Sequence, residues 1–110
     1  MIRFIAVLTL LSFQPASTPP SIVFVCEHGA AKSVIAAAHF RRLAGARGLQ
    51  IGAVAAGTEP DVELAPGAVK GLAAEGLSAA PTRPRPVTLY DLRSATRVVT
   101  DAPDCTSRAV

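Results

Sequence analysis

The sequence predicts an α/β domain with three layers, α/β/α, built on a short parallel sheet with helices on both faces. Three observations support this prediction. The apolar, β-branched run Ser21–Val25 has the composition of a buried central strand. A loop of small residues follows this run, and a helical pattern begins directly after the loop. Strand, helix, strand, helix, helix and strand patterns succeed one another, as right-handed crossovers in a parallel sheet require.

Composition restricts the chain to one domain and narrows its partners. Half of its 110 residues are hydrophobic and 17% are charged, which is enough apolar material for a core. The net charge of +3 is mild, and the few aromatic residues do not interleave with a basic stripe, so no nucleic-acid partner is expected. The two cysteines, Cys26 and Cys105, have no metal-ligand spacing, and only His28 and His39 are available to join them. Neither a metal site nor a cofactor is expected.

The first twenty residues differ from the rest. Arg3 precedes the apolar run Phe4–Phe13, and a polar, proline-rich stretch then ends at Pro20. This arrangement is typical of a secretory signal peptide, and the apolar run is too short to form a stable membrane span. We therefore predict a signal peptide and linker over residues 1–20 of an exported (periplasmic or secreted) protein, and one domain over residues 21–110. If the start codon is instead assigned too early, a cytoplasmic location is expected.

A helix is predicted from Ser33 to about Ala44 because apolar residues recur there at helical spacing. His39 in this helix is expected to be solvated and is given no role. Gly45 and Gly48 are expected to end the helix. The inner face is predicted to carry Ala36, Phe40 and Leu43.

The second half of the chain continues the alternation of predicted strands and helices. A strand is predicted over Ile51–Ala56, and a helix from Pro66, which suits a first helical turn, to Gly76. A proline-rich connector follows, and Thr88 with an acid three residues later predicts a capped short helix. Arg97–Thr100 is predicted to be the third strand. The inward side chains of the second helix are predicted to be Val69, Leu72 and Ala73.

The functional signal lies between Cys26 and Ser33. Strand, loop and helix in this order direct the loop amides and the helix N-terminus at one spot, which favours an oxyanion. The same field stabilises a thiolate, so Cys26 is expected to lose its proton easily. The oxyanion-binding loop is predicted to comprise Glu27, His28, Gly29, Ala30 and Ala31, and Lys32 and Ser33 follow it.

Two other interpretations of the loop are possible from the sequence. Ala31-Lys32-Ser33 matches the end of the nucleotide-binding Gly-x4-Gly-Lys-Ser loop, but Cys26 and Ala31 occupy both glycine positions, which disfavours it. A buried structural cysteine before an ordinary helix is the second alternative, since cysteine is among the most buried residue types.

The spacing Cys26-x5-Lys32-Ser33 resembles the phosphate loop of the low-molecular-weight protein tyrosine phosphatases and the related thioredoxin-coupled arsenate reductases. Their pattern is Val-Cys, five residues, Arg-Ser and a helix. The string from Val54 to Thr58 resembles the family's second strand and its Ser-Ala-Gly-Thr turn, with Ala55 in place of the serine. The resemblance spans Ser21 to Thr100.

The resemblance implies a role for each loop residue. Cys26 is the nucleophile that attacks a phosphate ester or arsenate, and the loop amides hold the equatorial oxygens. Lys32 supplies positive charge, and the Ser33 hydroxyl lowers the pKa of the thiol. Gly29 supplies backbone freedom, and His28 shapes the loop.

The sequence departs from the family pattern in two places. Lys32 replaces an arginine, and an ammonium lacks the paired hydrogen bonds of a guanidinium. The family's Asp-Pro aspartate, which protonates the leaving group, has no match in Asp101-Ala102-Pro103-Asp104, so we expect a domain incomplete at its C-terminus. Weak phosphatase activity is predicted. The alternatives are a catalytically impaired oxyanion-binding module, or an arsenate-reductase-like thiol redox protein with Cys105 as resolving cysteine and a thioredoxin-like reductant.

Overall fold

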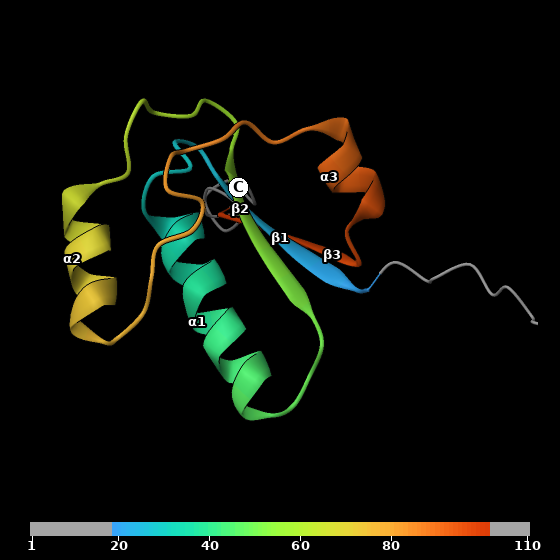
Figure 1. Ribbon diagram of the computed structural model, residues 1–110. Helices are drawn as coiled ribbons and strands as arrows, with labels where there is room; N and C mark the ends of the chain where they lie inside the picture. Colours follow the sequence, from blue (N-terminus) through green and yellow to red (C-terminus); the bar gives the residue numbers. More distant parts are fainter. Residues whose placement is uncertain (1–18, 102–110) are drawn as a thin grey trace, which may run out of the picture.

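The structure, a computed structural model, describes residues 19–101. The strands form one parallel sheet in the order β2-β1-β3, so β1 is central and its last residue, Cys26, lies in the middle of the carboxyl edge of the sheet (Figure 1). The predicted α/β fold class is confirmed. The elements are β1 (Ser21–Cys26), α1 (Lys32–Ala46), β2 (Gly52–Gly57), α2 (Pro66–Ala74), α3 (Leu89–Ser94) and β3 (Arg97–Thr100).

Two predictions concern residues that lie largely or wholly outside this range. The signal peptide and linker predicted over residues 1–20 lie outside the described residues except for the last two, and Cys105 lies outside them as well. Within residues 19–101, no helix has the length and apolar character needed to cross a membrane.

The core has two parts, one on each face of the sheet. Side chains alternate along β1, so Val23 and Val25 pack on one face with Ala56, while Phe24 points to the other. On the Phe24 face, α1 packs against β1 and β2 and also contacts α2. On the opposite face the segment around Val87 and the short helix α3 complete the cover. The buried residues of the first face are Val34, Ala37, Ala38, Ala55 and Leu72.

The inner face of α1 differs from the predicted one. Val34, Ala37 and Ala38 are buried against the sheet, because their small side chains let the helix backbone approach β2 closely. Of the predicted inner residues, Leu43 is exposed, and Phe40 is half-buried, with its ring centroid 5.8 Å from that of Phe24 of β1. Ala36, the third predicted residue, is only half-buried. Gly45 lies inside α1 rather than ending it, and the chain turns instead at Gly48, where φ is +66°.

The helix α2 begins at Pro66 as predicted, and Gly76 follows it with φ of +71°. Leu72 is buried as predicted, whereas Val69 and Ala73 are exposed, and Ala68 takes the second inner position. A period of 3.6 residues places positions four apart on one face, which is the spacing of the two buried side chains.

His39 is not the solvated side chain that the sequence predicts. It is half-buried, and its Nε2 lies 3.0 Å from Oε2 of Glu75, just after α2, while its Nδ1 contacts Arg42. His39 therefore links α1 to the end of α2.

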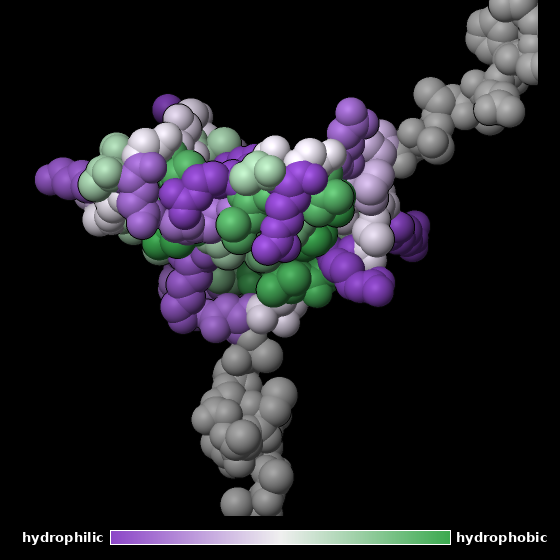
Figure 2. All heavy atoms as spheres, turned by 90° about the horizontal axis from the view of Figure 1, so that it is seen from below, coloured by the Kyte–Doolittle hydropathy of each residue, from purple (hydrophilic) through white to green (hydrophobic). Residues whose placement is uncertain are grey.

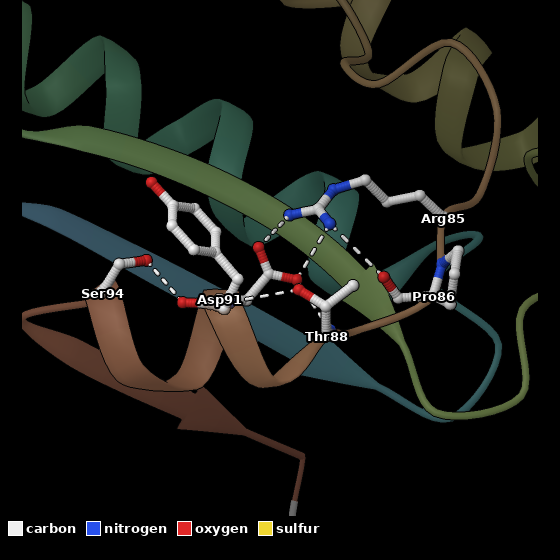
Figure 3. A network of polar contacts seen from close by, with 6 residues as sticks. Arg85, Pro86, Thr88, Asp91 and Ser94 are labelled. Atoms are coloured by element: carbon white, nitrogen blue, oxygen red, sulfur yellow. Dashed lines mark hydrogen bonds and ion pairs between the residues drawn. The ribbon is translucent and has the colours of Figure 1, made fainter.

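The connector before α3 is held by a bidentate ion pair (Figure 3). Two nitrogens of Arg85 donate to the Asp91 carboxylate at 2.9 and 2.8 Å. The same carboxylate accepts the backbone N–H of Thr88, whose hydroxyl accepts the N–H of Asp91, which completes the predicted capping box. The hydrogen bonds from Arg85, with those from Thr88, overcome the effect of burial and lower the pKa of Asp91 to about 2.

Not all apolar side chains are covered. Every residue of β3 is exposed, including Val98 and Val99. Seen from below the view of Figure 1, hydrophobic residues gather in the middle of this face, with hydrophilic residues among and around them (Figure 2).

Replacing Asp91 by Asn is expected to lower the free energy of unfolding by about 2 kcal/mol at pH 7, since the depressed pKa reports stabilisation of the charged carboxylate. The sign follows from the direction of the shift. The contribution is complete above the unfolded-state pKa near 3.9 and is lost as the pH falls toward about 2. Urea unfolding from pH 7 to pH 2 measures it, with the exposed Glu63→Gln as control. Equal losses in the two variants would contradict the assignment.

Candidate active site

The loop after β1 depends on a close backbone contact with the end of β2. Gly29 has φ of +59°, a conformation that favours glycine, and it packs against Gly57. A Cβ built on Gly57 would lie 2.7 Å from the Gly29 nitrogen, and one built on Gly29 would lie 2.9 Å from the Gly57 nitrogen. Only two glycines allow this approach.

The carbonyl groups of the loop are bound by the segment that follows β2. Four backbone N–H groups of that segment donate to loop carbonyls over 2.7–3.0 Å. Because these carbonyls are directed at the β2–α2 segment, amides of the loop remain free to face the thiol. The pairs are Thr58 to Cys26, Glu59 to Glu27, Asp61 to His28 and Ala65 to Ala30.

Cys26 lies next to the amides of its own loop and is 8% exposed. Its Sγ accepts the N–H of Gly29 at 3.2 Å and lies 3.1 Å from Oγ of the buried Ser33. Burial alone would raise the pKa of the thiol. Hydrogen bonds from the Ser33 hydroxyl and from the backbone amides of Ser33, Gly29 and Ala30 outweigh burial, so the pKa of Cys26 is below its ordinary value.

The first turn of α1 is arranged to receive negative charge. No side chain caps its N-terminus, and no acidic residue lies in its first turn. Ser33 lies in this first turn, but its hydroxyl contacts the thiol and does not cap the helix. The free amides and the helix dipole therefore act on the same spot as the sulfur.

The Lys32 ammonium is paired with a carboxylate at the mouth of the site. Its Nζ lies 2.6 Å from Oδ2 of Asp101, the residue directly after β3, and its side chain is 75% exposed. The hydrogen bond and the charge of Asp101 raise the pKa of Lys32. Asp101 was missed as a site residue in the sequence. The available signal was its position at the carboxyl end of a strand adjacent to β1, where loops of a parallel sheet converge.

His28 lies at the rim. Its Nδ1 is 3.3 Å from Oδ1 of Asp61, its Nε2 is 3.8 Å from Oε2 of Glu27, and its side chain is exposed. The ring is therefore held by carboxylates, and the structure gives it no hydrogen bond to the sulfur.

Two cavities open beside Cys26. Each is lined by Cys26, Lys32 and Asp101. The first, of about 230 Å³, adds the loop residues Glu27, His28, Ala30 and Ala31, with Asp61 and Ala65. The second, of about 170 Å³, lies toward β3 and adds Phe24, Val25, Ser33, Ala36, Val99 and Thr100. The described residues contain no cluster of three histidine, cysteine or acidic side chains that would hold a metal ion. A stabilised thiolate next to free amides can act as a nucleophile toward a bound oxyanion.

Replacing Gly57 by Ala is expected to destabilise the protein by about 1–3 kcal/mol, because the new methyl group must displace the backbone of Gly29. Gly67→Ala is the matched control, since a Cβ there meets nothing within 4 Å and lies in α2. Thermal unfolding of both variants is the measurement. A Gly57→Ala protein as stable as the Gly67→Ala protein would show that the loop after β1 does not contact the end of β2.

Replacing Ser33 by Ala removes a hydrogen bond to the thiolate. The pKa of Cys26 is then expected to rise, and alkylation of Cys26 by iodoacetamide at pH 7 to slow by about tenfold. Peptide mass spectrometry reads the rate at Cys26 alone. Ser94→Ala, which alters an exposed hydroxyl bonded to the Tyr90 carbonyl, is the control. Unchanged reactivity in Ser33→Ala would contradict the role assigned to this hydroxyl.

Solved proteins are similar to this chain in fold and sequence. YfkJ from Bacillus subtilis is 28% identical with a TM-score of 0.70, over 84% of this chain and 60% of that one. A low-molecular-weight protein tyrosine phosphatase from T. tengcongensis is 25% identical with a TM-score of 0.68, over 74% and 57%. A thioredoxin-dependent arsenate reductase from Corynebacterium glutamicum is 30% identical with a TM-score of 0.67, over 78% and 42%.

The chain thus spans about half the length of the solved proteins that it matches. No curated protein matches it. Residues 21–104 match the family described as low molecular weight phosphotyrosine protein phosphatase. The match covers most of the chain and includes the strand, loop and helix that build the thiol site, and the chain belongs to this family.

Proposed function

We propose that the protein is a weak cysteine-dependent phosphatase that acts on phosphate monoesters. The observation that carries the proposal is the placement of the Cys26 sulfur, with a lowered pKa, among the free amides at the start of α1. Amides at a helix N-terminus bind the oxygens of a phosphate group, and the same donors stabilise the charge that develops in the transition state.

The reaction proceeds in two displacements. The Cys26 thiolate attacks phosphorus, an S–P bond forms, and the ester P–O bond breaks with its electron pair leaving on oxygen. The leaving oxygen takes a proton from solvent. Water then attacks phosphorus, the S–P bond breaks, and inorganic phosphate and the thiolate are released.

Two features favour low activity: the contact of Lys32 with Asp101, and the mismatch of Asp101-Ala102-Pro103-Asp104 with the family's Asp-Pro aspartate. The Lys32 ammonium is bound to Asp101 and makes only point-charge contact with an oxyanion. An alkyl or tyrosyl leaving group gains from protonation by a positioned acid, which contributes about 10²–10⁴-fold in rate. Aryl phosphates with acidic leaving groups need this help least, and we expect them to be the best substrates.

Turnover of p-nitrophenyl phosphate by the full chain tests the proposal. Cys26→Ser is expected to abolish turnover because it removes the nucleophile. Lys32→Arg is expected to increase turnover about tenfold or more, because a guanidinium makes two parallel hydrogen bonds to the oxyanion.

Alkylation of Cys26, measured against pH with and without inorganic phosphate, is the companion measurement. A midpoint below the free-thiol value of about 8.5, with protection by phosphate, is the expected result. Protection without turnover would contradict the phosphatase proposal and support a catalytically impaired oxyanion-binding module. An ordinary midpoint without protection would contradict both.

A second candidate is an arsenate-reductase-like thiol redox function. It is favoured by the position of Asp101, which lines both cavities at Cys26 and stands four positions before Cys105 in the sequence. In this reaction the Cys26 thiolate attacks arsenic, an S–As bond forms, and an As–O bond breaks with loss of water. The Cys105 thiolate then attacks the Cys26 sulfur, and the S–As bond breaks with its electron pair on arsenic. Arsenic leaves as arsenite, the two thiols become a disulfide, and a thioredoxin-like dithiol reduces it. Loss of two hydrogens in mass after arsenate treatment supports this candidate, and an unchanged mass contradicts it.

A further inference from the structure

The ion pair between Lys32 and Asp101 joins two rigid elements across the mouth of the site. Lys32 is the first residue of α1, and Asp101 follows β3 directly. The backbone N–H of Asp101 donates to the Val25 carbonyl at 3.1 Å, which extends the pairing of β3 with β1 by one residue. The Asp101 carboxylate is therefore presented by a fixed backbone, whereas the Lys32 ammonium is carried by a flexible stem.

The position of this ion pair relates it to the thiol. Lys32 and Asp101 both line each of the two cavities that contain Cys26, so the pair stands beside the sulfur between the two openings. An oxyanion that enters either opening approaches both partners.

The other charges at the rim have different contacts. Glu27 and Asp61 also line the larger cavity, but both lie beside His28, at 3.8 and 3.3 Å. Asp101 is the carboxylate bound to Lys32. Removing the Asp101 charge therefore acts on the cation of the loop, and removing the Asp61 charge does not.

We propose that Asp101 is an internal competitor of the oxyanion: it holds Lys32 in an ion pair across the mouth of the site, and a phosphate bound at Cys26 must draw Lys32 away from it. The inference rests on the proposed function, because it presupposes an oxyanion at Cys26. Asp101 is thus a positioning residue that acts through Lys32 and weakens anion binding.

The exchange of partners is energetically accessible. Exposed ion pairs contribute little to stability, so Lys32 loses little when it leaves Asp101. A phosphate dianion carries twice the charge of a carboxylate and attracts the ammonium more strongly at equal distance. While the Asp101 carboxylate remains nearby, it also repels the bound anion.

Protection of Cys26 against iodoacetamide by inorganic phosphate tests the proposal. The full chain is used, and peptide mass spectrometry gives the dissociation constant of phosphate from the Cys26 alkylation rate. Asp101→Asn removes the competing charge and keeps the backbone donor, and Asp101→Ser is a second variant with the same effect on charge. Asp61→Asn is the matched control, because it removes one carboxylate from the same cavity without touching Lys32. The set is completed by Lys32→Met and the double variant Lys32→Met/Asp101→Asn.

Asp101→Asn is expected to tighten phosphate binding about three- to tenfold at low salt. Asp61→Asn is expected to change it less than about twofold, because the pair it disturbs does not include Lys32. In the Lys32→Met background, Asp101→Asn should keep only the part of its effect that comes from direct repulsion of the anion, since the cation it competes for is gone.

The proposal is overturned if Asp101→Asn and Asp101→Ser leave phosphate binding unchanged or weaken it. It is also overturned if Asp61→Asn tightens binding equally, or if the effect persists in full without Lys32. If phosphate protects the unmodified protein and the Asp101 variants equally well, this inference alone is contradicted. Absence of protection in the unmodified protein and in every variant contradicts the proposed function as well.

Discussion

The backbone contact between Gly29 and Gly57 is the constraint on which the site depends. It brings the loop after β1 against the end of β2, where four N–H groups bind the loop carbonyls. With those carbonyls engaged, the amides of the loop are left for the sulfur of Cys26. The N–H and the carbonyl of Gly57 are themselves bonded to Arg85 and Val87, so the connector that carries the Asp91 ion pair also supports this end of the sheet. The proposed anion site is therefore built mainly from main chain.

Much of the fold was predictable because its signals are local. The apolar run of β1, the proline at the start of α2 and the capping box at Thr88 each act within a few residues, and each predicted element was found within about two residues of its boundaries. The inner face of α1 was not predictable in the same way. Its sequence offers alanines at neighbouring positions, and the packing of Ala37 against Ala55 of β2, a tertiary contact, selects the face.

The candidate site shows the same difference between local signals and long-range contacts. The loop from Cys26 to Ser33 was recognised because its chemistry lies within eight consecutive residues. The partner of Lys32 is 69 positions away, and that of His39 lies beyond another helix. Nothing in the local sequence of either residue reports such a partner, because the contact exists only after the strands and helices have packed. The replacement of arginine by Lys32 was visible, but the direction of its charge was not.

The two edges of the sheet are not equivalent. Beyond β2, Pro86 forms a bridge with Gly57, so the connector covers that side at its carboxyl end. Beyond β3, the described residues place no further strand, and Val98 and Val99 are exposed. Unpaired N–H and carbonyl groups along such an edge are a template for another strand. Among residues 19–101, β3 is therefore the edge from which the sheet can be extended.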